Sequence, residues 1–264
     1  MEQVNAAPRI LVVEGDQATG ELLSQLFILE GYQVQLVSTL EDAQFWLAKH
    51  MVELVLTDSF SSYRALALDR LEALRRQAYP IPVGLLTAWK IPPEEVAARG
   101  FAFLIGKPFD LTTLLEAVAA ALSTDWSAEQ QLQAAAVERF FAMLNARAWE
   151  DIPALCSEQV RHYTPTFLMA HGVVQGFEAL RAHMEEGFSL YPNSRYDEVH
   201  CYPTPEGIAA RYIWHWTWPD RPAYQMTGGK MFYFSAGRIA QIGNELDAQQ
   251  MTLLLDQHIS VKAS

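Results

Sequence analysis

Residues 9–16 read RILVVEGD, a short apolar run that ends directly in acidic side chains. Similar runs recur through the first half of the chain and alternate with stretches of helical periodicity. This alternation predicts an α/β fold, a doubly wound parallel sheet of five strands with its functional site at the strands' carboxyl ends. The predicted strands are Arg9–Val13, Gln33–Val37, Glu53–Thr57, Pro82–Thr87 and Phe101–Ile105. The predicted helices are Thr19–Glu30, Leu40–His50, Tyr63–Gln77, Pro93–Arg99 and Leu111–Leu122.

Polar residues stand at the ends of four of these strands. Glu14 and Asp16 follow the first strand, Asp58 follows the third, Thr87 ends the fourth, and Lys107 follows the fifth. Phosphoryl transfer to a carboxylate needs a nucleophilic Asp, acidic groups for Mg²⁺, a cation for the developing charge and a small hydroxyl. The sequence offers candidates for each of these roles. Asp58 is the candidate phospho-acceptor, and the candidate Mg²⁺ ligands are Glu14, Asp16 and Asp58.

Residues 9–122 resemble the receiver domains of response regulators, which have a flavodoxin-like fold. Asp58 stands at that family's phosphorylation position, Thr87 matches its switch hydroxyl, and Lys107-Pro108-Phe109 match its Lys-Pro-Phe signature. The resemblance implies a two-component-type signal transduction protein. Its expected partner is a histidine kinase or another signalling protein.

The acidic site departs from that family's usual pattern. Two adjacent acids usually follow the first strand, but the second of them is Gly15 here, so one direct metal ligand is missing. Ser59-Phe60-Ser61-Ser62 replace the usual residues after the acceptor, and Leu104 takes the aromatic switch position. We therefore expect weakened Mg²⁺ binding and slow or lost phosphorylation. In the plainer interpretation, the acids and the hydroxyl are ordinary polar groups of a degenerate receiver.

Ser123–Ser127 interrupts the alternation of strands and helices. We therefore predict a receiver domain over residues 8–122, a linker over 123–128 and a second domain over 129–258. The second domain places helices before extended segments, which is an α+β pattern. Its predicted helices are Glu129–Ala146, Trp149–Leu155 and Phe177–Ser189. Its predicted extended segments are Tyr196–Pro203, Ile208–Trp218, Lys230–Ser235 and Arg238–Leu246.

Residues 132–257 resemble the SnoaL-like branch of the nuclear-transport-factor-two-like superfamily, a cone-shaped α+β half-barrel around a pocket. The resemblance is spread along the domain. It is carried by Val137–Cys156 (VERFFAMLNARAWEDIPALC), His171–Met184 (HGVVQGFEALRAHM), Tyr191-Pro192-Asn193, Gly237-Arg238-Ile239 and Leu253–Gln257 (LLLDQ).

The resemblance also names positions where enzymes of that fold carry their chemistry. Isomerases use a Tyr, a carboxylate base and a protonated Asp, and those positions hold Phe140, Thr164 and Lys230 here. Polyketide-cyclase relatives use an Asp on the last strand, for which Asp247 is the candidate. Asp247 is otherwise the N-cap of a tail helix over Ala248–Asp256. We therefore favour binding over catalysis, with a receiver-regulated cyclase, isomerase or hydrolase as the alternative.

Aromatic residues alternate along Ile208–Trp218, so four of them share one face of the predicted strand. They are Tyr212, Trp214, Trp216 and Trp218. These rings either fill the cone or line a site for a small apolar ligand. In the second case the pocket also includes Tyr163, Lys230 and Asp247. A third interpretation treats both halves as interaction scaffolds without a ligand.

Both halves of the 264-residue chain are acidic. Residues 1–126 hold 9 Lys and Arg against 16 Asp and Glu, and residues 127–264 hold 10 against 15, which gives the net charge of −12. Neither half has the basic footprint that nucleic-acid binding needs. No apolar run reaches the roughly 18–20 residues of a membrane span. With two cysteines and no signal-peptide pattern in residues 1–8, we expect a cytoplasmic protein. We also expect a homodimer with no cofactor besides Mg²⁺.

Overall fold

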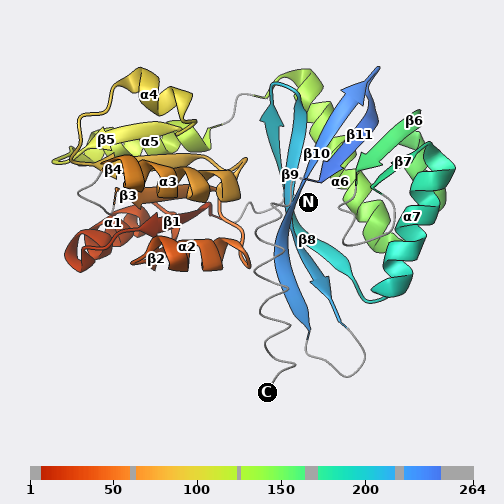
Figure 1. Ribbon diagram of the computed structural model, residues 1–264, viewed down its shortest axis with the longest axis horizontal. Helices are drawn as coiled ribbons and strands as arrows, with labels where there is room; N and C mark the ends of the chain where they lie inside the picture. The colour runs from red at the N-terminus through yellow and green to blue at the C-terminus, as the bar shows by residue number, and fades with distance from the viewer. Residues whose placement is uncertain (1–6, 60–63, 124–125, 164–171, 218–222, 245–264) are drawn as a thin grey trace. The chain divides into compact units, whose positions relative to one another are not determined.

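The computed structural model describes residues 7–59, 64–123, 126–163, 172–217 and 223–244. The chain divides into two compact units, Met1–Asp125 and Trp126–Ser264 (Figure 1). Each unit has its own sheet and its own core. Among the helices in these ranges, none combines the length and the apolar character needed to cross a membrane.

The first unit is a five-stranded sheet in the order β2-β1-β3-β4-β5, and every pairing is parallel. Its strands are β1 (Arg9–Val13), β2 (Gln33–Val37), β3 (Leu54–Asp58), β4 (Val83–Thr87) and β5 (Phe103–Gly106). Its helices are α1 (Gln17–Leu29), α2 (Leu40–Leu47), α3 (Arg64–Ala78), α4 (Pro93–Ala98) and α5 (Leu111–Leu122). The flavodoxin-like α/β fold predicted from the alternation is confirmed.

The central strands are buried on both faces because helices cover the sheet from either side. β1 is buried along Ile10–Val13, and β4 is buried throughout. Such strands are continuous apolar runs rather than alternating ones, as expected for a parallel sheet. α1 packs Leu23 and Phe27 into the same core, and it ends where Gly31 adopts φ +88°, a left-handed conformation that glycine tolerates.

The strand register brings the carboxyl ends of the inner strands to one edge. Val13 lies opposite Thr57, Asp58 opposite Leu86, and Thr87 opposite Gly106. The polar residues that follow these strands therefore meet at a single place.

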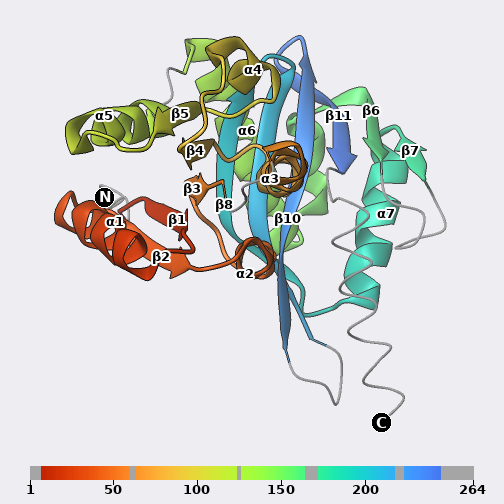
Figure 2. The same cartoon turned by 60° about the vertical axis from the view of Figure 1, so that its left-hand side comes forward.

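The second unit is a mixed six-stranded sheet in the order β7-β6-β11-β10-β9-β8. Its strands are β6 (Cys156–Tyr163), β7 (Val173–Gln175), β8 (Arg195–Thr204), β9 (Gly207–Trp216), β10 (Tyr224–Ser235) and β11 (Arg238–Asn244). Its helices are α6 (Ala128–Ala146), the short 3₁₀ helix η1 (Trp149–Ala154) and α7 (Phe177–Leu190). Figure 2 shows β8, β9 and β10 as long neighbouring strands with α6 against the sheet.

Two parts of this sheet differ from the sequence-based prediction. β6 and β7 were not predicted, and β10 begins at Tyr224 rather than Lys230. β6 pairs in parallel with β11, so the unit is more than helices followed by a meander. The sequence CSEQVRHY of β6 carries few β-branched residues, and Gly228-Gly229 resemble a turn although they lie inside β10. The predicted tail helix lies outside the described residues.

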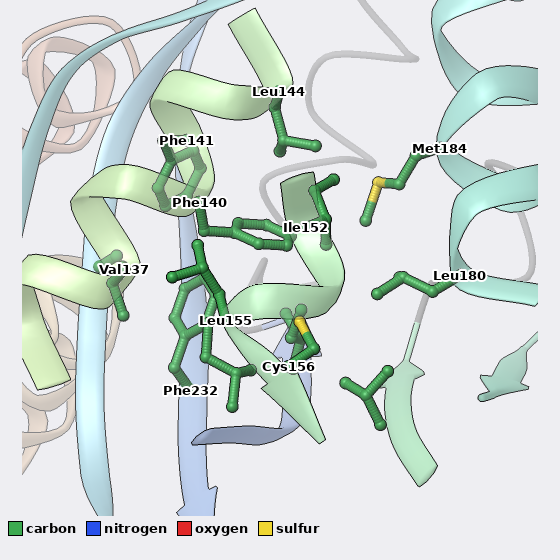
Figure 3. Close-up of a cluster of buried hydrophobic side chains, with 14 of the residues drawn as sticks. Val137, Phe140, Phe141, Leu144, Ile152, Leu155, Cys156, Leu180, Met184 and Phe232 are labelled. Carbon is green, nitrogen blue, oxygen red and sulfur yellow. The ribbon is translucent and has the colours of Figure 1, made fainter. Parts of the chain in front are cut away.

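An aromatic core joins α6 to the sheet (Figure 3). Phe140 and Phe141 project from α6 towards Phe232 of β10, with centroid separations of 5.6 and 5.9 Å and edge-on geometry. All three rings are almost fully buried. Leu180 and Met184 of α7 extend the same cluster. These side chains form one packed core between α6, β10 and α7.

Candidate functional site

The edge of the first sheet gathers three of the predicted residues into one ionic group. Lys107 Nζ lies 2.8 Å from Glu14 Oε2 and 2.9 Å from Asp58 Oδ1. The Lys107 backbone N–H donates to the Thr87 carbonyl at 2.7 Å, which ties the β5 end to β4. Glu14 is buried, whereas Lys107 and Asp58 are partly accessible. The lysine is therefore an ammonium held between two carboxylates.

The chemistry of Lys107 follows from these contacts. Burial alone would lower its pKa, but the hydrogen bonds and charges of Glu14 and Asp58 outweigh burial and raise the pKa above its ordinary value. Lys107 is therefore a permanent positive charge at the acidic edge. That is the property required of a group that stabilises charge on a transferring phosphoryl.

Asp16 does not join this group. Its Oδ1 accepts a hydrogen bond from the Thr19 backbone N–H at 2.8 Å, so it is the N-cap of α1. Hydrogen bonds from the side chain and the backbone of Thr19 together lower the pKa of Asp16. Glu14 Oε1 accepts the Asp16 backbone N–H at 3.1 Å, which fixes the turn between them.

The arrangement does not fit the Mg²⁺ site predicted from Glu14, Asp16 and Asp58. Within the described ranges, no three His, Cys, Asp or Glu side chains come together as a group that could hold a metal ion. Gly15 contributes no ligand, Asp16 caps a helix, and Lys107 lies between the remaining two carboxylates. As the chain is folded, the cation of this site is the lysine.

Thr87 is at the same edge but its hydroxyl faces its own loop. Thr87 Oγ1 accepts the Trp89 backbone N–H at 3.0 Å, and the residue is fully buried. The threonine thus links the end of β4 to the segment that leads to α4.

The aromatic stripe of β9 divides between two clusters in the second unit. Tyr212 lies in the main core, 5.0 Å from Phe141 and 5.1 Å from Tyr196 between ring centroids. Trp214 and Trp216 pack on each other at 4.5 Å. Tyr191, Tyr224 and Met226 complete this second cluster. The Trp214 indole N–H is buried there, and none of the described residues accepts a hydrogen bond from it. Trp218 lies outside the described residues.

Lys230 is the predicted pocket residue with the most unusual surroundings. Its Nζ lies 3.2 Å from His162 Nε2, and the His162 ring is 5.2 Å from that of His183. All three side chains are buried. Tyr163 follows His162 on β6, so alternation directs it to the opposite face from this cluster. Thr164 and Asp247 lie outside the described part of the chain.

The two histidines were not among the predicted site residues. His162 is recognisable only once Cys156–Tyr163 is known to be a strand that directs it inwards. His183 lies on the buried face of α7 with Leu180 and Met184, a spacing that suggests an ordinary core position. Phe140, at the position of the isomerase tyrosine, is fully buried against Phe232 and offers no hydroxyl.

Comparison with known proteins agrees with these two architectures. Residues 137–242 match the family model of the SnoaL-like domain. The response regulator protein FleR of Pseudomonas aeruginosa is 34% identical over 116 residues, 43% of this chain and 24% of that protein. The transcriptional regulatory protein PcoR of Escherichia coli is 33% identical over 118 residues, 42% of this chain and 49% of that protein. The chain thus spans about a quarter and about half of these relatives' lengths.

One solved structure matches the first unit. The non-phosphorylated HemR receiver domain from Leptospira biflexa is 27% identical, and the match covers 46% of this chain and 98% of that one with a TM-score of 0.40. The N-terminal half of this protein matches response-regulator receiver domains by sequence, and its five-stranded parallel sheet is the fold expected of them. Residues 137–242 are a SnoaL-like domain.

Proposed function

We propose that this protein is a two-component-type signalling protein in which Asp58 accepts a phosphoryl group. The observation that carries the proposal is the Asp58 carboxylate at the end of β3, 2.9 Å from the Lys107 ammonium. A carboxylate oxygen of Asp58 attacks the phosphorus of an acyl phosphate, and the donor leaves as a carboxylate. Lys107 neutralises charge on the transferring phosphoryl. Because Glu14 also holds Lys107, and the described residues form no group of three that could hold Mg²⁺, we expect transfer to be slow.

Thr87 is the proposed reporter of phosphorylation. A phosphoryl group on Asp58 adds acceptor oxygens that draw the Thr87 hydroxyl away from the Trp89 amide. The loop that carries Trp89 then rearranges, which supplies an optical signal. A histidine kinase or another signalling protein would read or supply the phosphoryl group.

Acetyl phosphate tests the acceptor. Intact mass and peptide mapping of the treated chain should place one phosphoryl group on Asp58, and Asp58→Asn should remove it. Asp69→Asn, an exposed aspartate of α3, is the matched control and should leave the modification unchanged. Modification that persists in Asp58→Asn would show that another group is the acceptor.

For the SnoaL-like domain, we propose binding of a small apolar ligand. A buried N–H without an acceptor is costly, and the Trp214 indole is such a donor inside an aromatic cluster. A ligand with one acceptor atom on an apolar body would satisfy it. The enzyme alternative is weaker because the three isomerase positions hold Phe140, Thr164 and Lys230. Homodimerisation through this domain also stays a proposal, tested by light scattering of the full chain.

Benzyl alcohol is a suitable probe, since it pairs an apolar ring with one hydroxyl. It should quench tryptophan fluorescence and stabilise the domain, by about 2.7 kcal/mol at about 100 times Kd. Trp214→Phe keeps the ring but removes the N–H, so it should weaken binding. If neither benzyl alcohol nor similar apolar compounds stabilise the domain, the ligand-binding proposal is wrong, and the interpretation of both halves as interaction scaffolds without a ligand stands. A difference in affinity between the phosphorylated and unmodified chains would test coupling of the two domains.

A further inference from the structure

Lys230, His162 and His183 form a buried cluster built from three separate elements of the second unit. Lys230 comes from β10, His162 from β6 and His183 from α7, and their exposed fractions are 7%, 3% and 5%. The amine nitrogen of Lys230 lies within hydrogen-bonding distance of His162 Nε2 at 3.2 Å. The backbone of three elements thus converges to place one amine beside one imidazole.

The face of β10 that carries Lys230 is apolar and aromatic next to it. Alternation along β10 puts Lys230 on the same face as Phe232 and Gly228. Phe232 belongs to the core of Figure 3. A Cβ added at Gly228 would lie 2.5 Å from the Tyr212 ring, so the glycine allows that ring to approach the strand. Lys230 therefore extends from the aromatic interior rather than from a solvated surface.

These surroundings change the protonation of both groups. Burial lowers the pKa of Lys230 to about 8, so about a tenth of it is the neutral amine at pH 7. An ordinary lysine, with a pKa of about 10.4, is neutral in less than about one molecule in a thousand at that pH. Burial, with smaller contributions from Lys230 and His183, holds the pKa of His162 well below its usual value. His162 is therefore a neutral imidazole that can accept or donate a proton.

We propose that Lys230 is a nucleophilic amine that forms an imine with a small aldehyde or ketone, and that His162 relays the protons. The Nζ lone pair attacks the carbonyl carbon, a C–N bond forms, and the carbonyl electron pair moves to oxygen. A proton passes from nitrogen to that oxygen through His162 Nε2. His162 Nε2 then takes a proton from solvent and passes it to the hydroxyl oxygen, the C–O bond breaks as water leaves, and the nitrogen lone pair forms the C=N bond. The products are a protonated imine and water. No oxidant or reductant takes part.

This inference rests on the proposed ligand site of the SnoaL-like domain and names the ligand's class. It also assigns a role to Lys230, which occupies the position that holds the second acid in the isomerases. A desolvated lysine near another cationic or imidazole group is a recognised way to obtain an amine nucleophile. A carbonyl group is the functional group with which such an amine reacts.

Reductive trapping tests the proposal on the full chain. Benzaldehyde is added with sodium cyanoborohydride at pH 7, and benzylated lysines are quantified by peptide mapping. Lys230 should be labelled at least about tenfold faster than the exposed Lys90 because more of it is neutral. The labelling rate of Lys230 should reach half its maximum near pH 8. Labelling of Lys230 no faster than that of Lys90 would overturn the proposal.

Variants separate the proposed chemistry from simple reactivity. Lys230→Arg keeps the positive charge without an accessible neutral form, so its peptide should stay unlabelled; Lys230→Met serves if the arginine does not fold. His162→Gln should slow labelling of Lys230, whereas His200→Gln, on β8 at the opposite side of the sheet, should not. Equal rates in wild type and His162→Gln would remove His162 from the mechanism and contradict the proposal as stated.

Benzyl alcohol distinguishes failure of the imine from failure of the ligand site. If it stabilises the domain while Lys230 remains unlabelled by benzaldehyde, the ligand site stands and the imine is wrong. If neither compound acts, both proposals fail.

Discussion

Lys107 and Lys230 are the same side chain in two opposite environments. Lys107 lies between two carboxylates at the edge of the receiver sheet, and those partners raise its pKa. Lys230 lies beside an imidazole in an aromatic interior, and burial lowers its pKa to about 8. One lysine is a permanent cation and the other is within reach of the neutral form. The neighbours of a lysine, rather than its identity, decide which chemistry it can perform.

The comparison also separates the two domains by what their buried polar groups do. In the receiver, Lys107 compensates the charge of buried Glu14, so the pair holds the acidic edge in place. In the SnoaL-like domain, the polar cluster of Lys230, His162 and His183 lies in a domain whose core is apolar. The first arrangement favours rigidity of the acidic edge. The second favours reactivity.

Removal of Lys107 should have the largest effect on stability. Lys107→Met leaves Glu14 as a buried carboxylate without its ammonium, and breaking a buried pair from one side costs about 3–5 kcal/mol. Because Lys107 is partly exposed, we expect about 3 kcal/mol. Urea denaturation followed by circular dichroism measures it. Lys90→Met, on an exposed lysine of the same domain, should change stability by less than about 0.5 kcal/mol. Similar losses in the two variants would mean that the ionic group does not stabilise the receiver.

The pH dependence of stability should distinguish the two lysines by sign. The pKa of Lys230 is lowered on folding, so the unfolded chain binds more protons between pH 8 and about 10.4, and stability rises with pH there. The rise should total about 3 kcal/mol, or 1.4 kcal/mol for each unit of pKa. Lys107 has a raised pKa, so its contribution is constant below about pH 10.4 and is lost only as pH rises through its folded pKa.

Lys230→Met is the control for this measurement. The variant keeps Tyr196, Tyr212 and the cysteines, so other titrations cancel in the difference between the two curves. The difference should grow from pH 8 to pH 10. A wild-type curve parallel to that of Lys230→Met would show that Lys230 is protonated to the same extent in both states.

A smaller effect is expected when the missing acid is restored beside Lys107. Gly15→Asp adds a carboxylate next to Glu14 and should increase Mg²⁺ affinity by about tenfold, equivalent to ~1.4 kcal/mol. Isothermal titration calorimetry measures the change, and Gly15→Asn, similar in shape but neutral, should produce much less. Unchanged affinity in Gly15→Asp would mean that the loop after β1 does not present its second residue to the metal.

The smallest expected effect concerns nucleic-acid binding, which we expect neither domain to show. Residues 1–126 and 127–264 each carry more acids than bases, so neither should bind duplex DNA at about 150 mM salt. Fluorescence anisotropy with mixed-sequence duplexes should show no saturable change. Affinity approaching the ~10⁻⁸ M of specific binders would contradict the prediction.

The receiver could be predicted from sequence because its signals are local. Each buried parallel strand is an apolar run, and the residue after the run must lie at the sheet's carboxyl edge, which places Asp58 and Lys107 together. The Mg²⁺ ligands could not be predicted in the same way. Asp16 has a carboxylate that could bind a metal, but in the structure that carboxylate caps α1. The sequence pattern gives the position of a carboxylate at the end of a strand, but only the folded structure shows which groups that carboxylate contacts.

The SnoaL-like domain was harder because its decisive pairings are distant. β6 has a polar, alternating sequence whose strand character depends on β11. Gly228 looks like a turn residue but accommodates the Tyr212 ring inside β10. His162 and Lys230 lie 68 residues apart in the chain, and no periodic pattern in either segment indicates that their side chains meet.

The parallel pairing of β6 with β11 has a consequence for the order in which the nascent chain acquires structure. Parallel neighbours on the receiver sheet follow one another after a single helix or one intervening strand, so that domain can fold while the rest of the chain is still being synthesised. β6 must wait for β11, the last strand described, before its inner edge is paired. Cys156–Tyr163 is therefore an unpaired edge for most of the time that the ribosome takes to make the second domain. We expect this segment to be the one that a ribosome-associated chaperone protects.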